Sequence, residues 1–253
     1  MTRFKALIAY DGTDFYGWQT QREEPTVQST LESCLRQICG RQVSVIGSGR
    51  TDSGVHALGQ VAHFDWDHHL SAEKLPLAIN AIVPFSVRVQ SVEPVEPDFN
   101  ARINALSKSY LYRIDRNRNF DPFNFRYALH NYSPLDLDLM RHLATMIEGE
   151  HDFSAFQAAG TDIVNTNRTV FCLEIFEPSG DLLQAHRHFL FLRIRANGFL
   201  RKMVRFLVGT LIEIGSGKRP PEHMKRALES GDKGCVGVPA PARGLFLEKV
   251  YYE

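Results

Sequence analysis

Short apolar runs with the two-residue period of a strand alternate along the chain with segments whose apolar residues recur at helical spacing. Most connections between these runs are too short to hold the crossover that joins parallel neighbouring strands. This pattern favours the α+β class, with mixed or antiparallel sheets flanked by helices. We expect strands at 4–10, 43–46, 61–64, 87–92, 110–114, 170–176, 184–196 and 245–252, and helices at 27–38, 75–82, 136–147 and 200–214.

The length of 253 residues is near the upper limit for a single hydrophobic core. Both halves offer a strand, a loop and an amphipathic helix in similar order, although their sequences are too different to establish a duplication. We therefore expect two similar α+β lobes, an N-terminal lobe at 1–105 and a C-terminal lobe at 106–253.

The composition, 43% hydrophobic and 23% charged, is that of a globular protein that folds throughout. The four cysteines form no Cys-x-x-Cys pair, and no apolar stretch is long enough for a signal peptide or a membrane span. We therefore expect a cytoplasmic protein with no membrane partner.

The histidines show no spacing typical of a metal site. His68 and His69 are adjacent, so they point opposite ways in a strand, and His186 with His188 lacks nearby Cys or carboxylate ligands. We expect no metal.

The charge balance, 29 basic against 29 acidic residues, by itself argues weakly against a nucleic-acid partner. The distribution points the other way, because the segment 182–212 holds several basic residues and no acidic one. These are Arg187, Arg193, Arg195, Arg201, Lys202 and Arg205. The segment either attracts phosphates or forms an ordinary solvated face.

A polar loop lies between two apolar runs and reads Gly-Arg-Thr-Asp-Ser-Gly-Val-His from Gly49 to His56. An aspartate between glycines is more often a turn residue than a catalytic one. The density of polar side chains around Asp52, however, is more typical of a site on a rigid scaffold. Phosphate-binding, dinucleotide-binding and nucleophilic-serine motifs are absent, so no nucleotide cofactor is implied and carboxylate chemistry remains.

The expected helix at 200–214 is apolar around nearly its whole circumference, which indicates burial. Arg205 lies in its middle, and a buried guanidinium needs an anionic partner. That partner is either a structural glutamate or a site carboxylate such as Asp52; the sequence favours neither.

The strand 187–195 places Arg187, Phe189, Phe191, Arg193 and Arg195 on one face. Arginines could meet phosphates there and rings could stack on bases, or the rings could be core with the arginines at the strand ends. Tyr110 and Tyr112 share a face of an earlier strand, and the pattern does not choose between them as site residues.

The residues just described resemble those of the tRNA pseudouridine synthase A family over essentially the whole chain. The Gly-Arg-Thr-Asp-x-Gly-Val-His motif is highly specific, and Ser53 departs from it only in replacing the usual alanine with another small residue. The segments that carry the resemblance include Tyr10-Asp11-Gly12, Gly17-Trp18-Gln19, Gly49 to Ala57, Gly59-Gln60-Val61, Lys108 with Tyr110 and Tyr112, His151-Asp152-Phe153, Met203-Val204-Arg205 and Gly244-Leu245.

The resemblance implies a pseudouridine synthase fold, with pseudo-twofold-related lobes and a cleft between them. It implies a homodimer that isomerises uridine at positions 38, 39 and 40 of the tRNA anticodon stem-loop without cofactor or metal. Asp52 matches the catalytic aspartate, acting as nucleophile or base. Arg205 matches the arginine that pairs with it, Tyr110 the tyrosine that packs on the target base, and Arg50 the arginine that helps to extrude the nucleotide.

Two other functions would use the same residues. A tRNA-binding or folding protein without turnover would share the basic surface but would have no need of a carboxylate near phosphates. An RNA N-glycosidase would share the carboxylate and release free base.

Overall fold

The computed structural model describes residues 1–67, 69–160, 163–178 and 188–253. The chain divides into two compact units, Met1–Leu106 with Phe246–Glu253 (unit 1) and Ser107–Leu245 (unit 2). The C-terminal segment Phe246–Glu253 therefore folds with the N-terminal residues. The lobe boundary at 105 and the pseudo-twofold relation between lobes stay predictions.

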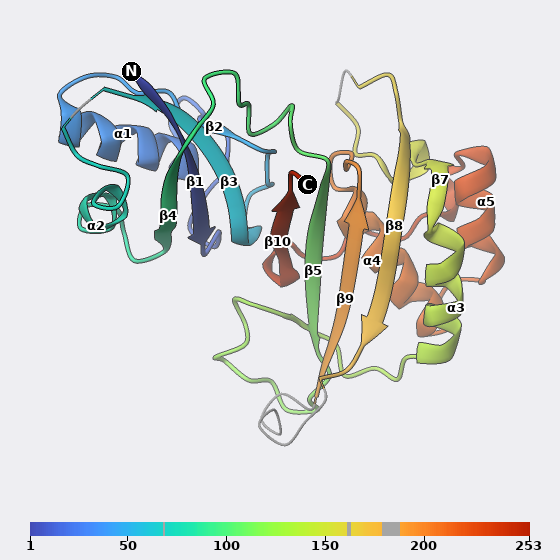
Figure 1. Ribbon diagram of the computed structural model, residues 1–253. Coiled ribbons are helices and arrows are strands. Elements are labelled where there is room, and N and C mark those ends of the chain that lie inside the picture. The colour runs from blue at the N-terminus through green and yellow to red at the C-terminus, as the bar shows by residue number, and fades with distance from the viewer. Residues whose placement is uncertain (68, 161–162, 179–187) are drawn as a thin grey trace. The chain divides into compact units, whose positions relative to one another are not determined.

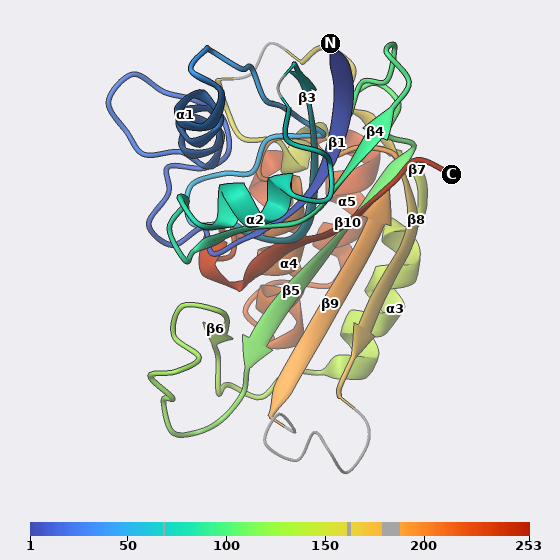
Figure 2. The same cartoon turned by 60° about the vertical axis from the view of Figure 1, so that its left-hand side comes forward.

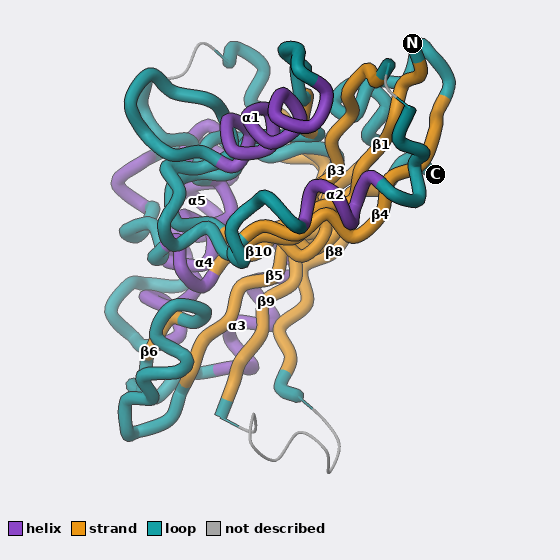
Figure 3. Tube along the Cα trace, turned by 90° about the vertical axis from the view of Figure 1, so that its left-hand side faces the viewer, coloured by secondary structure: helices purple, strands orange, loops and turns teal. Residues whose placement is uncertain are grey.

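Unit 1 is a mixed sheet with two helices. Its strands are β1 (Thr2–Tyr10), β2 (Ile46–Gly47), β3 (His56–Trp66), β4 (Val87–Val95) and β10 (Leu245–Tyr251), in the order β4-β1-β3-β10 with β2 beside β3. β1 runs antiparallel to β3 and β4, whereas β10 runs parallel to β3. The helices α1 (Val27–Cys39) and α2 (Leu75–Asn80) lie on the same side of this sheet (Figures 1 and 3).

Local signals account for the position of α1. Thr26 and Ser29 form a reciprocal capping box at its start, which satisfies backbone donors that have no partner within the helix. Gly40 ends the helix in the left-handed conformation, at φ 74°, where glycine carries no steric cost. One stripe of the helix is buried and comprises Val27, Leu31, Cys34 and Leu35.

Unit 2 is a second mixed sheet. Its strands are β5 (Ser107–Asp115), β6 (Leu129–His130), β7 (Gly149–Asp152), β8 (Asn167–Phe176) and β9 (Phe189–Ala196). The order is β5-β9-β8-β7, antiparallel throughout, and β6 pairs in parallel with β5. The helices are α3 (Leu137–Ile147), α4 (Met203–Gly215) and α5 (Glu222–Ser230), with short 3-10 turns at Ser154–Phe156, Lys233–Cys235 and Ala242–Gly244.

The strand register gives the sheet of unit 2 two different faces. Tyr112 pairs with Leu192, and Leu192 with Ile175, so these buried residues share the face covered by α3, α4 and α5. Figure 2 shows the three helices together behind the strands. The alternate residues occupy the opposite face and include Leu111, Arg113, Phe191, Arg193, Glu174 and Phe176.

The α+β class, with mixed sheets and flanking helices, is confirmed in each unit. Several boundaries differ from expectation: the strand at 43–46 is reduced to Ile46–Gly47, the helix at 75–82 ends at Asn80, and α5 was not anticipated. The strand expected from 184 begins at Phe189, and residues 184–187 lie outside the described residues. None of the helices in the described part of the chain combines the length and hydrophobicity needed to cross a bilayer.

Candidate active site

The loop that carries Asp52 joins β2 to β3 in unit 1. Asp52 is half-buried, Arg50 and Ser53 are exposed, and Thr51 is only 7% exposed. The loop therefore leaves Asp52 partly accessible and turns the preceding residue, Thr51, into the interior.

Thr51 anchors the loop to the end of β1. Its hydroxyl lies 2.8 Å from the hydroxyl of Tyr10, and its carbonyl accepts a 3.1 Å hydrogen bond from the backbone N–H of Trp18. Burial raises the pKa of Tyr10 to about 12, so the phenol stays protonated at neutral pH. The side chain and the carbonyl of Thr51, the residue before Asp52, are thus held by the end of β1 and by the segment that follows it.

His56 holds the other end of the loop. Its side chain is 1% exposed and stacks on Phe246 at a centroid distance of 4.6 Å. Its Nδ1 accepts a 3.0 Å hydrogen bond from Gly12 N–H, and an Asp11 carboxylate oxygen lies 3.1 Å away. A neutral His56 can accept from Gly12, whereas a protonated ring would instead donate to Asp11.

Two glycines let the backbones approach closely. A Cβ on Gly12 would lie 2.0 Å from the carbonyl oxygen of Val55, and a Cβ on Gly17 would lie 2.5 Å from that of Thr51. Gly17 also has φ 90°, a conformation that side chains disfavour. Glycine is therefore required at both positions if the loop is to sit against this segment.

Gln60 braces the loop from β3. Its side chain is fully buried; the carbonyl accepts from Ser48 Oγ at 2.7 Å and the amide donates to Gly49 O at 3.0 Å. Each of these buried polar groups has a partner, so the network stiffens the loop without the cost of unsatisfied groups.

The exposed side chains of the loop also have partners. Arg50 Nε donates to Gln19 Oε1 at 3.1 Å, and Gln19 in turn donates to Gln28 at 2.8 Å. Ser53 Oγ donates to the carbonyl of Phe15 at 3.3 Å, so its hydroxyl has a backbone partner.

These contacts change the interpretation of the polar loop. Thr51 and His56, which the sequence suggested as part of a polar site, are buried structural groups. Tyr10, Gly12, Gly17 and Gln60 hold the loop, although the sequence assigned them no role. The available signal was their presence in the motifs that carried the family resemblance.

Arg205 lies in unit 2, in the first turn of α4 rather than in the middle of a helix, because α4 begins at Met203. It is half-buried, and its Nε donates to Ala240 O at 2.7 Å, a backbone partner that neither sequence alternative included. Lys202 precedes the helix in the left-handed conformation, at φ 61°, a strained backbone for a residue with a side chain. The first turn holds no acidic residue, so Arg205 adds to the positive end of the helix dipole.

The two tyrosines of β5 differ in their surroundings. Tyr112 is fully buried, donates its hydroxyl to Pro241 O at 2.9 Å, and has a pKa raised by burial. Tyr110 is 8% exposed and meets Phe199 edge-to-face at 5.0 Å. The structure therefore gives Tyr112 a structural hydroxyl, a distinction that the sequence pattern did not provide.

The residues of β9 only partly follow the nucleic-acid hypothesis. Phe189 is buried and Phe191 half-buried, and Arg193 pairs with Glu174 at 3.3 Å, which offsets part of the expected positive charge. Arg187, His68 and His186 lie outside the described residues. Among the residues that are described, no cluster of three or more His, Cys, Asp or Glu could hold a metal ion.

Comparison with known proteins identifies the family of the chain. Residues 6–103 and 143–253 match the family described as tRNA pseudouridine synthase. Arg50, Asp52 and Arg205 fall within the matched stretches, and Tyr110 falls between them. The chain belongs to the tRNA pseudouridine synthase family.

The similarity to individual relatives extends over the full length of the chain. The tRNA pseudouridine synthase A of Brevibacillus brevis is 42% identical over 252 residues, and that of Listeria monocytogenes serovar 1/2a is 40% identical over 255; both matches cover 100% of each chain. A solved archaeal box H/ACA sRNP Nop10-Cbf5 complex is similar with a TM-score of 0.34 and 11% identity, covering 91% of this chain and 59% of that chain. A structural similarity this low carries no argument about the family, so the family assignment rests on the sequence comparisons.

Proposed function

We propose that the protein isomerises uridine to pseudouridine in the anticodon stem-loop of tRNA, with Asp52 as the catalytic carboxylate. The observation that carries this proposal is the loop itself: Asp52 is partly accessible and lies between residues that the end of β1, the segment after it and Gln60 hold in place. A carboxylate on so stiff a support can be kept in one orientation toward a substrate. Membership of the tRNA pseudouridine synthase family indicates the reaction in which this carboxylate would take part.

The chemistry requires little else. The C1′–N1 bond breaks, the uracil turns while held, and a C1′–C5 bond forms; C5 loses a proton and N1 gains one, so the product is an isomer and no cofactor is consumed. Asp52 either attacks C1′ to give a covalent intermediate or removes a sugar proton to give a glycal. Both routes need the carboxylate ionised and correctly placed.

Arg205 is proposed to pair with Asp52. The support for this pairing is electrostatic. Arg205 lies in the first turn of α4, and that turn holds no acidic residue. Its guanidinium and the helix N-terminus therefore create a positive field that favours an anion. Such a partner would limit the rotation of the Asp52 carboxylate.

Tyr110 and Arg50 are proposed as substrate-binding residues. Tyr110 offers a ring already fixed edge-to-face by Phe199, suited to packing on a uracil. Arg50 is exposed beside Asp52 and is held by Gln19, so it could take the place of a nucleotide that leaves the stack. We further propose that the protein acts as a homodimer in the cytoplasm, as two α+β lobes with the site in a cleft between them.

The test is tritium release from tRNA that carries 5-tritiated uridine, without added metal or cofactor. Asp52→Asn should lower turnover about a thousandfold or more and retain tRNA binding. Release of free uracil would identify an N-glycosidase instead, and binding without any turnover by the unaltered protein would identify a tRNA-binding protein. Normal turnover by Asp52→Asn would refute the catalytic role.

The roles of the other residues can be separated in the same assay. Tyr110→Phe should keep most activity because the ring remains, whereas Tyr110→Leu should lower kcat. Arg205→Met should lower kcat more than it lowers tRNA affinity, because Asp52 would lose the group proposed to hold its orientation. An unchanged kcat would contradict the pairing.

A further inference from the structure

Arg50 is held by an uncharged partner. Its Nε donates to Gln19 Oε1 at 3.1 Å, and among the described residues its guanidinium has no other hydrogen bond. Arg3 of the same unit differs, because Asp65 accepts from its Nε at 2.8 Å and from its Nη2 at 2.9 Å. A carboxylate neutralises a guanidinium, whereas an amide holds it and leaves its charge intact. Arg50 is therefore fixed at Nε and still positive, with both terminal NH2 groups left for another molecule.

Behind Gln19 the hydrogen bonds continue to α1 in one direction. Gln19 Nε2 donates to Gln28 Oε1 at 2.8 Å, and Gln28 Nε2 donates to Glu32 Oε1 at 3.0 Å. Arg50 Nε–H and the backbone N–H of Thr20, which also bonds Gln28 Oε1 at 3.1 Å, can only donate, so they fix the orientation of both amides. The run thus extends from a cation to a carboxylate, and bonds aligned in this way strengthen one another.

The base of this run is attached to the core of unit 1. Gln28 and Glu32 lie one turn apart on α1 and both bond the backbone of Val45, a residue that is 2% exposed. Gln28 Nε2 donates to Val45 O and Glu32 Oε1 accepts from Val45 N–H, each at 3.0 Å. Reorienting Gln28 would break these bonds, so Gln19 and Arg50 are built on a support that does not turn.

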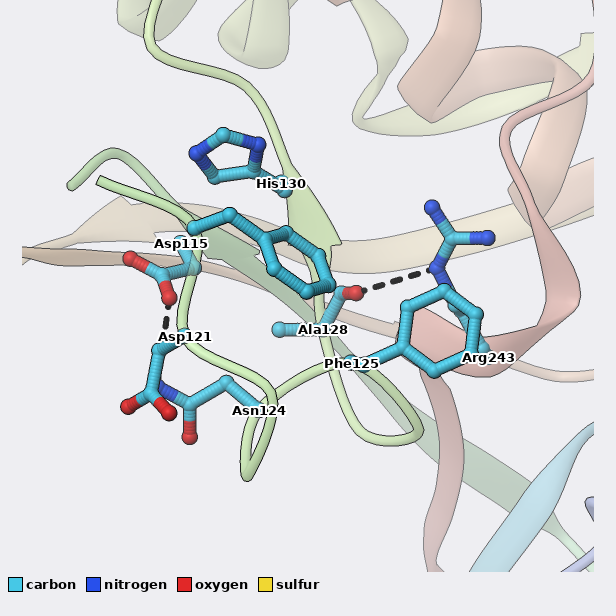
Figure 4. Close-up of a pocket in the computed structure, with 8 residues that line it drawn as sticks. Asp115, Asp121, Asn124, Phe125, Ala128, His130 and Arg243 are labelled. Atoms are coloured by element: carbon cyan, nitrogen blue, oxygen red, sulfur yellow. Dashed lines mark hydrogen bonds between the residues drawn. The ribbon is translucent and has the colours of Figure 1, made fainter. Parts of the chain in front are cut away.

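An amide that donates to a carboxylate does not by itself indicate a functional role. In unit 2, Asn124 donates to the buried carboxylate of Asp115 at 3.1 Å and to Asp121 at 2.9 Å (Figure 4). These residues lie at the end of β5 and in the loop that follows it, so the amide only closes its own loop. The run through Gln19 differs because it joins separate segments and ends at an exposed cation two residues before Asp52.

We propose that Gln19 is a positioning residue that holds Arg50 for the extrusion of the target nucleotide, an inference that rests on the role proposed for Arg50. Ordering so long a side chain only on contact with RNA costs conformational entropy. Gln19 fixes Nε before RNA arrives, so the guanidinium meets the stem in an orientation already set. Its terminal NH2 groups then take the place of the extruded nucleotide, where they can donate to a phosphate or to the base left unpaired.

Tritium release from two substrates tests the proposal. Gln19→Leu should lower turnover on a structured anticodon stem about fivefold or more, and on a short unstructured oligonucleotide by less than about twofold. In the Arg50→Ala background the same substitution should have no further effect, because nothing remains to be held. Asn124→Ala is the matched control, since it also removes an amide–carboxylate bond, and it should leave the ratio of the two rates unchanged. Circular dichroism verifies that each variant keeps its fold.

Two results would make Gln19 a merely structural residue and overturn the proposal. The first is an equal loss on both substrates in Gln19→Leu. The second is a loss that multiplies with that of Arg50→Ala, because independent effects combine in this way.

A fluorescence measurement separates extrusion from the reaction. The Asp52→Asn protein is mixed with an anticodon stem-loop that carries 2-aminopurine beside the target uridine, so that loss of stacking raises the emission. Adding Gln19→Leu should slow this rise about fivefold or more. A rise of unchanged rate would overturn the positioning role. If tritium release failed for the unaltered protein while the rise still depended on Gln19 and Arg50, the proposed reaction would be wrong and the positioning role would stand.

Discussion

The hydroxyl of Tyr10 lies 2.8 Å from that of Thr51, the residue immediately before Asp52, and both side chains are buried. The strand β1 therefore contacts the loop that carries Asp52 through a hydrogen bond between two buried side chains. Since Thr51 and Asp52 share a peptide, a change at Tyr10 should be felt at the carboxylate without any direct contact with substrate.

The stability losses from removing the two partners of this bond should not add. Tyr10→Phe or Thr51→Val removes one partner from a buried hydrogen bond and should lower the free energy of unfolding by about 1–3 kcal/mol. The double variant should lose less than the sum of the single losses, measured by urea unfolding. Single losses that simply add would show that the two hydroxyls act independently. In each single variant kcat should fall more than tRNA affinity, because the support of Asp52 is loosened.

Gly17→Ala tests the close approach of the loop to the segment after β1. The new Cβ would meet Thr51 O at 2.5 Å from a backbone with φ 90°, so we expect a loss of about 3 kcal/mol or more. Gly40→Ala is the matched control, because Gly40 has φ 74° with nothing within 4 Å of its Cβ, and it should lose only about 1–2 kcal/mol. Equal losses in thermal or urea unfolding would mean that only the dihedral angle matters.

Arg50→Ala should leave the free energy of unfolding within about 0.5 kcal/mol, because the side chain is exposed. Turnover on a structured stem should fall about tenfold or more, and turnover on a short unstructured oligonucleotide should fall less, since no stacked base has to be extruded there. Arg22→Ala, another exposed arginine of unit 1, controls for loss of charge. Equal defects on the two substrates would argue against a role in extrusion.

His63 should make unit 1 sensitive to acid. Its Nδ1 accepts a 3.1 Å hydrogen bond from Ala101 N–H, and burial, with a further contribution from Arg3, lowers its pKa below 6.5. The neutral ring is thus favoured in the folded state, so this contribution to stability is complete above about pH 6.5 and is lost as the pH falls through the lower folded pKa. His63→Asn, which keeps an acceptor that does not titrate, should show a flatter dependence in urea unfolding between about pH 7 and pH 5. A parallel dependence would assign the acid sensitivity to other groups.

Periodicity located most of the regular elements because it reports which side chains face a core. The buried residues Phe4, Ala6, Ile8 and Tyr10 alternate along β1, and the capping pair Thr26 and Ser29 fixes the start of α1. Boundaries were less predictable. Val43 and Val45 are buried like strand residues, but the ladder with β3 includes only Ile46 and Gly47, because pairing depends on a distant partner.

The sequence by itself determined the α+β class, the family and Asp52 as the candidate catalytic residue, because hydrophobic periodicity and a specific motif are local properties of a chain. Only the tertiary structure decided that Thr51 and His56 are buried supports, that Tyr10, Gly12 and Gln60 hold the loop, and that Arg205 begins a helix beside Ala240. The physical reason is that burial and hydrogen-bond partners arise from segments brought together by strand pairing, and no spacing within one segment records them. Asp52 was visible in the sequence, whereas the contacts that hold it in position were not.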